Sequence, residues 1–198
     1  MDKIRKIYEG ILEFIQAFMV KYKYENRGIL KKMKIDSRLN MEIKDDKWCE
    51  LFLYKSCFNH CAKFILLRYI EDSGYIYGKM NHSGIEKWKN FVKNISENFH
   101  ILYKIAIKDL QEEINDSISV IFKESDYDVF EIDEELAFIM VYNFSSIDFA
   151  RLDKKDIILL FRLIYSLEQR EEMALEVFYK DAPALSHIFK LEKLENIG

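Results

Sequence analysis

The scarcity of proline and glycine is the feature that most constrains this chain, which has one proline and six glycines among 198 residues. These two residue types supply most of the breaks and tight turns that strand-rich folds need. Apolar residues instead recur at intervals of three and four, the spacing that places them on one face of a helix. The sequence therefore predicts an all-α fold built as a single multi-helix domain.

Local signals divide the chain into successive amphipathic segments. The first covers residues 2–24, and Gly28 is expected to break it. Asp45 or Asp46 is expected to cap a second long helix that ends at Gly74, because glycine often terminates helices. Further helices are expected to begin at Ser83, Ser96, Asp133 and Asp153, the last of them running to about Glu176.

Residues at helical spacing on these segments define the expected core. The predicted set is Ile11, Ile15, Phe18, Phe52, Ile65, Tyr69, Phe99, Leu102, Ile139, Phe161 and Ile164. No apolar run reaches the roughly 18 residues that span a bilayer. The N-terminus leads into an amphipathic helix rather than a signal-peptide core. We therefore expect a cytoplasmic protein with no membrane partner.

The three cysteines, Cys49, Cys57 and Cys61, are crowded into one short segment. An odd number in such an arrangement argues against a disulfide framework. Cys57, His60 and Cys61 could suggest part of a metal site, but offsets of three and four on a helix also describe a buried stripe. Because no second ligand cluster follows, we expect no bound metal.

Charge is distributed unevenly, although the net charge is only −4. The range 21–38 carries seven basic residues against Glu25 and Asp36, a net charge of +5. The range 109–135 carries eleven carboxylates against Lys123 alone, a net charge of −10, and is expected to face away from any DNA. Clustered cations can neutralise a nucleic-acid backbone. The candidate DNA-binding residues are Lys21, Lys23, Arg27, Lys31, Lys32, Lys34 and Arg38.

Signatures of common enzyme classes are missing from the chain. It contains no phosphate-binding glycine loop, no G-x-S-x-G elbow, no H-E-x-x-H pair and no dinucleotide-binding glycine fingerprint. It also lacks an arginine followed four to six residues later by histidine, a pattern found in many small helical ribonucleases. We therefore expect no catalytic residue in this chain.

Three segments occur in a suggestive order. FILLRYIEDSG, from Phe64 to Gly74, ends an apolar helix with an arginine, a Glu-Asp pair and a glycine. YNFSSIDF follows at Tyr142–Phe149, and EVFYKDAPALSHIF stands near the C-terminus. This order resembles the helical region that precedes the catalytic domain in N6-adenine DNA methyltransferases of restriction-modification systems. The first motif matches at Leu66, Leu67, Arg68, Tyr69, Glu71, Asp72 and Gly74.

The resemblance covers roughly residues 48–189. It implies a helical domain at 1–176 and a C-terminal tail at 177–198 that would lead into a methyltransferase domain. In the family, the corresponding tail reads Phe/Tyr-Tyr-Thr-Pro and lies against S-adenosylmethionine. Phe178 and Tyr179 match its aromatic pair, whereas Lys180 and Asp181 replace Thr-Pro.

The chain stops at Gly198, before the glycine-rich cofactor strand and the Asn/Asp-Pro-Pro-aromatic motif that holds a flipped adenine. The resemblance therefore implies an incomplete cofactor site at Phe178 and Tyr179. S-adenosylmethionine would belong to the complete enzyme. We expect the isolated chain to neither bind it nor methylate DNA.

The resemblance implies a non-catalytic, DNA-positioning domain, present as a fragment or a split subunit, whose partners are double-stranded DNA and a catalytic methyltransferase domain or subunit. Phosphate contacts from the basic residues would position the duplex without reading its sequence. We expect Arg68, Glu71 and Asp72 to form an internal ion-pair network that fixes the next loop. The alternative is a free-standing helical interaction or regulatory protein of a phage or mobile element, which would bind a protein through an exposed aromatic face.

Overall fold

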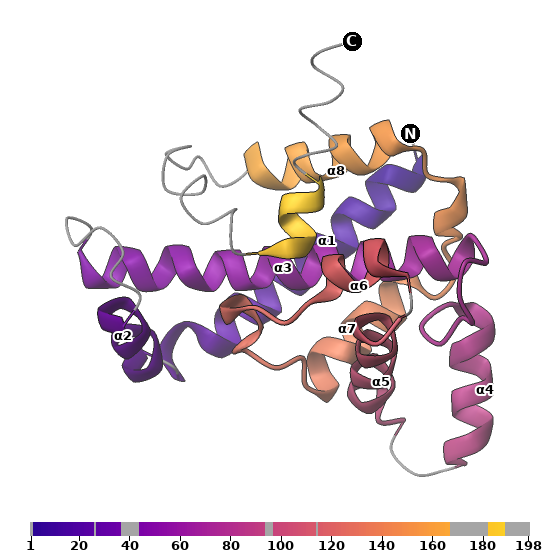
Figure 1. Cartoon of the computed structure of the whole chain (residues 1–198), viewed down its shortest axis with the longest axis horizontal. Helices are drawn as coiled ribbons and strands as arrows, with labels where there is room; N and C mark the ends of the chain where they lie inside the picture. Colours follow the sequence, from indigo (N-terminus) through magenta and orange to yellow (C-terminus); the bar gives the residue numbers. More distant parts are fainter. Residues whose placement is uncertain are drawn as a thin grey trace.

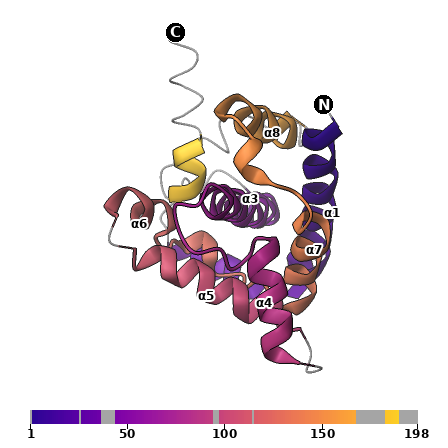
Figure 2. The same ribbon diagram turned by 90° about the vertical axis from the view of Figure 1, so that its right-hand side faces the viewer.

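The central element of the fold is helix α3, Asp45–Asp72, which has 28 residues and a length of roughly 42 Å. Between Leu51 and Ile70, all of its side chains except Tyr54 and Tyr69 are buried. A helix enclosed in this way buries its whole circumference rather than one stripe, and α3 buries polar side chains as well as apolar ones. Figure 2, which looks nearly along α3, shows the other helices arranged around it.

The computed structural model describes residues 2–25, 27–36, 44–93, 97–113, 115–166 and 182–188. All regular secondary structure in these ranges is helical, which confirms the all-α, single-domain prediction for this part of the chain. Besides α3, the elements are α1 (Asp2–Glu25), α2 (Arg27–Asp36), α4 (His82–Val92), α5 (Phe99–Gln111), α6 (Asp116–Phe122), η1 (Asp126–Asp128), α7 (Glu134–Phe144), η2 (Phe149–Arg151) and α8 (Lys154–Ser166). A further short helical segment covers 183–188.

The helices pack in pairs around α3. Helix α1 lies against α3, α7 and α8, while α5 lies against α6 and α7. Helix α2 covers the N-terminal end of α3, and α4 projects from the opposite end (Figure 1). The structure therefore has two exposed helical ends separated by the length of α3.

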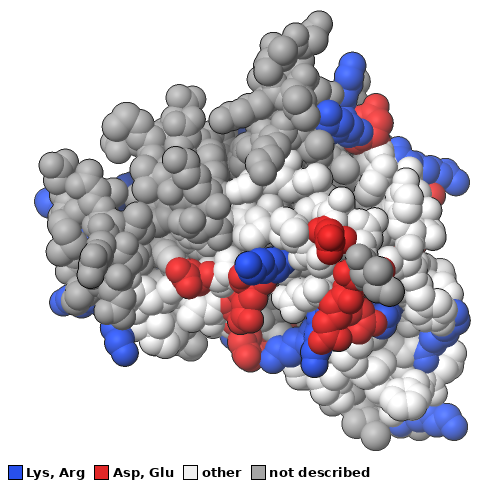
Figure 3. Space-filling model, in the orientation of Figure 1, with Lys and Arg blue, Asp and Glu red and all other residues white. Residues whose placement is uncertain are grey.

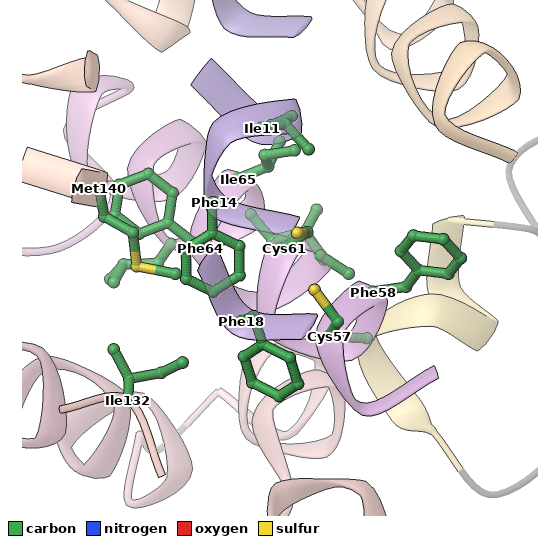
Figure 4. Packing of buried hydrophobic residues seen from close by; sticks show 14 of the residues in the cluster. Ile11, Phe14, Phe18, Cys57, Phe58, Cys61, Phe64, Ile65, Ile132 and Met140 are labelled. Atoms are coloured by element: carbon green, nitrogen blue, oxygen red, sulfur yellow. The ribbon is translucent and has the colours of Figure 1, made fainter. Parts of the chain in front are cut away.

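The core lies where α1, α3 and α7 meet. Figure 4 shows Phe14 of α1 close to Phe64 of α3 and Met140 of α7, with Cys57 and Cys61 in the same packed cluster. Most of the predicted core is buried, as expected, whereas Tyr69 and Ile139 are only partly buried. The confirmed core residues are Ile11, Ile15, Phe18, Phe52, Ile65, Phe99, Leu102, Phe161 and Ile164.

Two helix-end predictions near the N-terminal half need correction. Helix α1 ends at Glu25 and α2 begins at Arg27, so Gly28 lies inside α2 rather than at the break. The N-cap of α3 is Lys44 rather than Asp45 or Asp46, and it makes no side-chain capping bond. At the other end, α3 ends at Asp72 and its C-cap is Ser73, one residue before the predicted Gly74. Gly74 follows with a φ of +75°, a left-handed conformation that favours glycine just after a helix.

The remaining helix starts were predicted with mixed success. Helix α4 is capped by Asn81, whose side-chain oxygen accepts a hydrogen bond from the Gly84 N–H at 2.9 Å, and not by Ser83. Asp133 caps α7 as predicted, accepting from the Leu136 N–H at 3.1 Å. Ser96 and the expected continuation of α8 to Glu176 lie outside the described residues. Within the described ranges, we find no helix with both the length and the apolar character needed to cross a membrane.

Candidate functional site

The candidate DNA-binding segment lies at the end of the molecule formed by α1, α2 and the first turns of α3 (Figure 1). Lys23, Lys31 and Lys32 are exposed there. Lys34 differs, because its side chain is only 3% exposed and does not project into solvent as its neighbours do. The exposed lysines of this end are thus fewer than the sequence suggested.

Lys21 has a different environment from the other cations of the segment. Its ammonium forms ion pairs with Asp133, at the start of α7, and with Glu135 at 3.7 Å. The hydrogen bond to Asp133 raises the pKa of Lys21 despite its partial burial. The Arg27 side chain and the whole of Arg38 lie outside the part of the chain that the structure describes. Lys21 is therefore a link between α1 and α7.

A hollow of about 350 Å³ opens between α1, α2 and the start of α3. Lys23, Lys44 and Lys47 line it together with Asp46 and Glu50. The sequence reasoning missed Lys44 and Lys47 because adjacent aspartates cancel their charge in a count along the chain. Both lysines are exposed, so this end of the molecule presents lysines from three helical elements.

Several carboxylates of the acidic segment form ion pairs with lysines, some from distant elements and one from the same helix. Outside the Lys21 pairs, Asp109 pairs with Lys79, Glu131 with Lys104 at 3.0 Å, and Glu112 with Lys108 at 3.8 Å. In Figure 3, acidic side chains (red) lie beside basic side chains (blue) on the face in view. Because Asp133 and Glu135 contact Lys21, the expected separation of the basic and acidic segments is wrong at Lys21.

Arg68 is a buried cation that joins α3 to the turn after α7. Its guanidinium donates to the backbone oxygens of Phe144 at 2.8 Å and Ile147 at 2.7 Å, and it pairs with Asp72 at 3.1 Å. The guanidinium carbon also lies 4.8 Å from the centroid of the Phe149 ring, within cation–π range. Burial lowers the pKa of Arg68 and the neighbouring carboxylates oppose this.

The two carboxylates beside Arg68 each hold a different segment. Asp72 accepts from the Phe149 N–H at 2.8 Å, which fixes the start of η2. Glu71 accepts from the N–H groups of Lys79 at 2.8 Å and Met80 at 2.9 Å, which fixes the loop before α4. Burial raises the pKa of Glu71, and these backbone donors counteract the shift. The predicted ion pair is confirmed for Arg68 and Asp72. Glu71 fixes the next loop through backbone hydrogen bonds rather than through an ion pair with Arg68.

A second buried polar cluster centres on Asp128 of η1. One carboxylate oxygen accepts from the Lys63 ammonium at 2.6 Å and from the Asn59 amide at 3.0 Å. The other oxygen accepts from the Ser125 N–H at 2.8 Å. Lys63 is 2% exposed, so Asp128 neutralises a cation inside the fold. No local sequence signal predicts this pair, because its two residues are 65 positions apart.

His60 lies beside this cluster and is buried. Burial lowers its pKa to about 4, so the ring is neutral at pH 7. Its Nε2 lies 2.8 Å from the backbone oxygen of Phe130. Because a carbonyl oxygen can only accept, Nε2 carries the proton and donates it. His60 therefore anchors the segment after η1 through this hydrogen bond.

The other two sites considered in the sequence are a cysteine–histidine group on α3 and an aromatic pair near the C-terminus. Among the described residues, no group of histidine, cysteine, aspartate and glutamate side chains is arranged to hold a metal ion. Cys57 and Cys61 lie in the core with Cys49 partly exposed. Phe178 and Tyr179, the predicted remnant of a cofactor site, lie outside the described residues.

Comparison with known proteins identifies no relative of this chain. The chain matches no protein-family model, no curated protein and no solved structure.

Proposed function

We propose that this chain is a non-catalytic, DNA-positioning helical domain of a restriction-modification N6-adenine DNA methyltransferase, as a fragment or a split subunit in the cytoplasm. The observation that carries the DNA-binding part is the lysine-rich end around the hollow between α1, α2 and α3. Its exposed cations are Lys23, Lys31, Lys32, Lys44 and Lys47. Lysines spread over several rigid helices suit a phosphate backbone, because such contacts position a duplex without reading its sequence.

The contact between two segments that carry the resemblance supports the family part of the proposal. Arg68, from the first motif, donates to backbone oxygens within the second motif at Tyr142–Phe149. Asp72 of the first motif accepts from Phe149 of the second. This direct contact gives the two segments a shared physical reason to occur together in one chain.

The experiment that tests DNA binding is a salt series with a fluorescent duplex. The wild-type chain is compared with the triple variant Lys23→Glu, Lys31→Glu and Lys32→Glu. Each lost phosphate contact removes about 0.9 from the slope of log affinity against log salt. We therefore expect the triple variant to bind more weakly and with a slope smaller by up to about three units.

A matched control carries the same change in net charge elsewhere. It replaces three exposed lysines that lie outside the lysine-rich end, through Lys123→Glu, Lys154→Glu and Lys155→Glu. This control should keep the wild-type slope. Equal slopes in the wild type and the first triple variant would show that the lysine-rich end does not contact DNA.

A second candidate is the free-standing interaction or regulatory protein. It is favoured by an exposed aromatic pair on α7, where Phe138 and Tyr142 stack with centroids 6.1 Å apart and are 49% and 73% exposed. The coding sequence after Gly198 discriminates the two candidates. A glycine-rich strand and an Asn/Asp-Pro-Pro-aromatic motif, in frame or in the adjacent gene, are expected for the methyltransferase domain; their absence from both places favours the interaction protein.

A further inference from the structure

The end of the molecule opposite the lysine-rich end carries an apolar groove between α4, α5 and the loop before α4. The groove has a volume of about 280 Å³ and is lined by the rings of Tyr77, Trp88 and Phe91 and by Ile105. Tyr77 is 65% exposed and Phe91 is 79% exposed. The Trp88 and Phe91 rings lie side by side with centroids 5.9 Å apart. Large exposed rings gathered in one place commonly mark a binding surface.

Hydrogen bonds from α3 fix the backbone of the loop that borders this groove. Glu71 accepts from the backbone of Lys79 and Met80, which fixes the loop that carries Tyr77. A Cβ added at Gly84 would lie 2.3 Å from the backbone oxygen of Lys79, so the loop and the first turn of α4 are in close contact. The backbone on both sides of the groove is therefore held by the protein itself, which reduces the entropy lost when a ligand binds there.

Lysines border the aromatic surface, and two of them also contact carboxylates. The range 75–93 contains four lysines against the single carboxylate Glu86, a net charge of +3. The Lys87 ammonium lies 2.8 Å from the Tyr77 hydroxyl and 4.7 Å from the centroid of its ring. Lys89 lies 3.4 Å from Glu86, and Lys79 pairs with Asp109 of α5. In Figure 3 the α4 end, at the lower right, is white surface edged with blue.

We propose that this aromatic and basic surface binds a single-stranded stretch of nucleic acid. Phe91, Trp88 and Tyr77 would stack on unpaired bases, while Lys87, Lys89 and Lys93 would face the phosphates. Every base offers a π-face for stacking, and lysines beside the rings match the charge of the backbone. A duplex is a poorer ligand for this surface, because its base faces are already stacked inside the helix. The inference does not depend on the proposed duplex contact at the other end of the molecule.

The test uses a fluorescent oligothymidylate of about twelve nucleotides, within the usual site size of single-strand-binding modules. Wild type, Phe91→Ala and Tyr142→Ala are titrated at low salt. Loss of one stacked base weakens binding roughly 5- to 150-fold, so Phe91→Ala should lose affinity in that range. Tyr142 is a matched control, an equally exposed ring on α7, and its variant should bind as the wild type does.

Tryptophan fluorescence gives a second readout. The chain has two tryptophans; Trp48 is 1% exposed whereas Trp88 lines the groove. Stacking of bases on the groove should therefore quench Trp88 and leave the Trp48 signal as a constant background. The variant in which Lys23, Lys31 and Lys32 become glutamate should retain both the quenching and the single-strand affinity.

Three results would overturn the inference. The first is unchanged affinity in Phe91→Ala, and the second is an equal loss in Tyr142→Ala. The third is absence of oligonucleotide binding together with self-association that Phe91→Ala abolishes, which would assign the surface to a protein contact. Phe91 is 79% exposed, so the folded state should survive its replacement, and circular dichroism checks this.

Discussion

Arg68 is the side chain on which two distant parts of the fold depend. It is 1% exposed, yet its charge is balanced by Asp72 and by two backbone oxygens at 2.8 and 2.7 Å. A buried ion of this kind does not by itself add much stability, but removing one partner leaves the other uncompensated. The position at the end of an apolar helix made this residue recognisable in the sequence.

Arg68→Ala should therefore destabilise the protein by about 3–5 kcal/mol, because Asp72 and the carbonyls of Phe144 and Ile147 lose their donor. Urea denaturation measures the change. Arg151→Ala is the control, since Arg151 pairs with Asp148 at 2.9 Å with 81% of its side chain exposed, and such surface pairs contribute little. Similar midpoints for the two variants would show that Arg68 is not structurally important.

His60 predicts a specific dependence of stability on pH. Its pKa is about 4 in the folded state and about 6.5 in an unfolded chain. The unfolded state therefore takes up the proton first. Stability is highest above about pH 6.5 and falls as the pH drops towards 4, by about 1.4 kcal/mol per unit and about 3 kcal/mol in total.

His60→Gln removes this titration, because glutamine can still donate to Phe130 but does not protonate in the range. The free energy of unfolding of both proteins is measured from pH 7 to pH 4. As the pH falls, the free energy of unfolding should decrease less in the variant than in the wild type. Parallel curves would mean that His60 is already protonated or is not buried in the folded state.

At the scale of elements, α3 is unusual because a nearly enclosed helix carries several polar side chains. Lys63 is neutralised by Asp128 of η1, which lies 65 residues later in the sequence. We expect α3 and η1 to fold together, because burying either charged side chain without the other costs free energy. The 3₁₀ turn is therefore as much a part of the core as the helices around it.

Asp128→Ala should leave the Lys63 ammonium buried without a counter-ion, at a cost of about 3–5 kcal/mol. We expect a lower melting temperature and faster hydrogen exchange in the residues following α6. Asp126→Ala is the control, since Asp126 belongs to the same turn and is exposed. Equal melting temperatures for the two variants would mean that the ion pair with Lys63 does not anchor η1.

The element scale also shows which local signals were reliable. The Asp133 cap was predictable because its side chain acts on the adjacent backbone, and the end of α3 was predictable to within one residue because Gly74 adopts a left-handed conformation just after the Ser73 cap. The cap of α4 was missed because Asn81 and Ser83 are both good N-cap residues, and only the folded loop selects Asn81. The break near Gly28 was placed too late, since a glycine can be accommodated within a helix at modest cost.

At the scale of the whole molecule, the all-α fold was predictable because helical periodicity is local and the chain has few helix breakers. The pairing of charges was not predictable. Lys21 and Asp133 are far apart in sequence and meet only because α1 packs against α7. Counting charge along the chain therefore gave two opposed segments, whereas the folded surface has a lysine-rich end at α2 and an aromatic and basic end at α4.

The location of duplex contact tests the central claim most directly. Amide chemical shifts of the isotope-labelled chain are recorded during titration with a short unmodified duplex. We expect the largest changes in Lys23, Lys31, Lys32, Lys44 and Lys47, with little change in α5 and α6. Shifts concentrated on α5 and α6, or no shifts at low salt, would contradict a DNA-positioning role for the lysine-rich end.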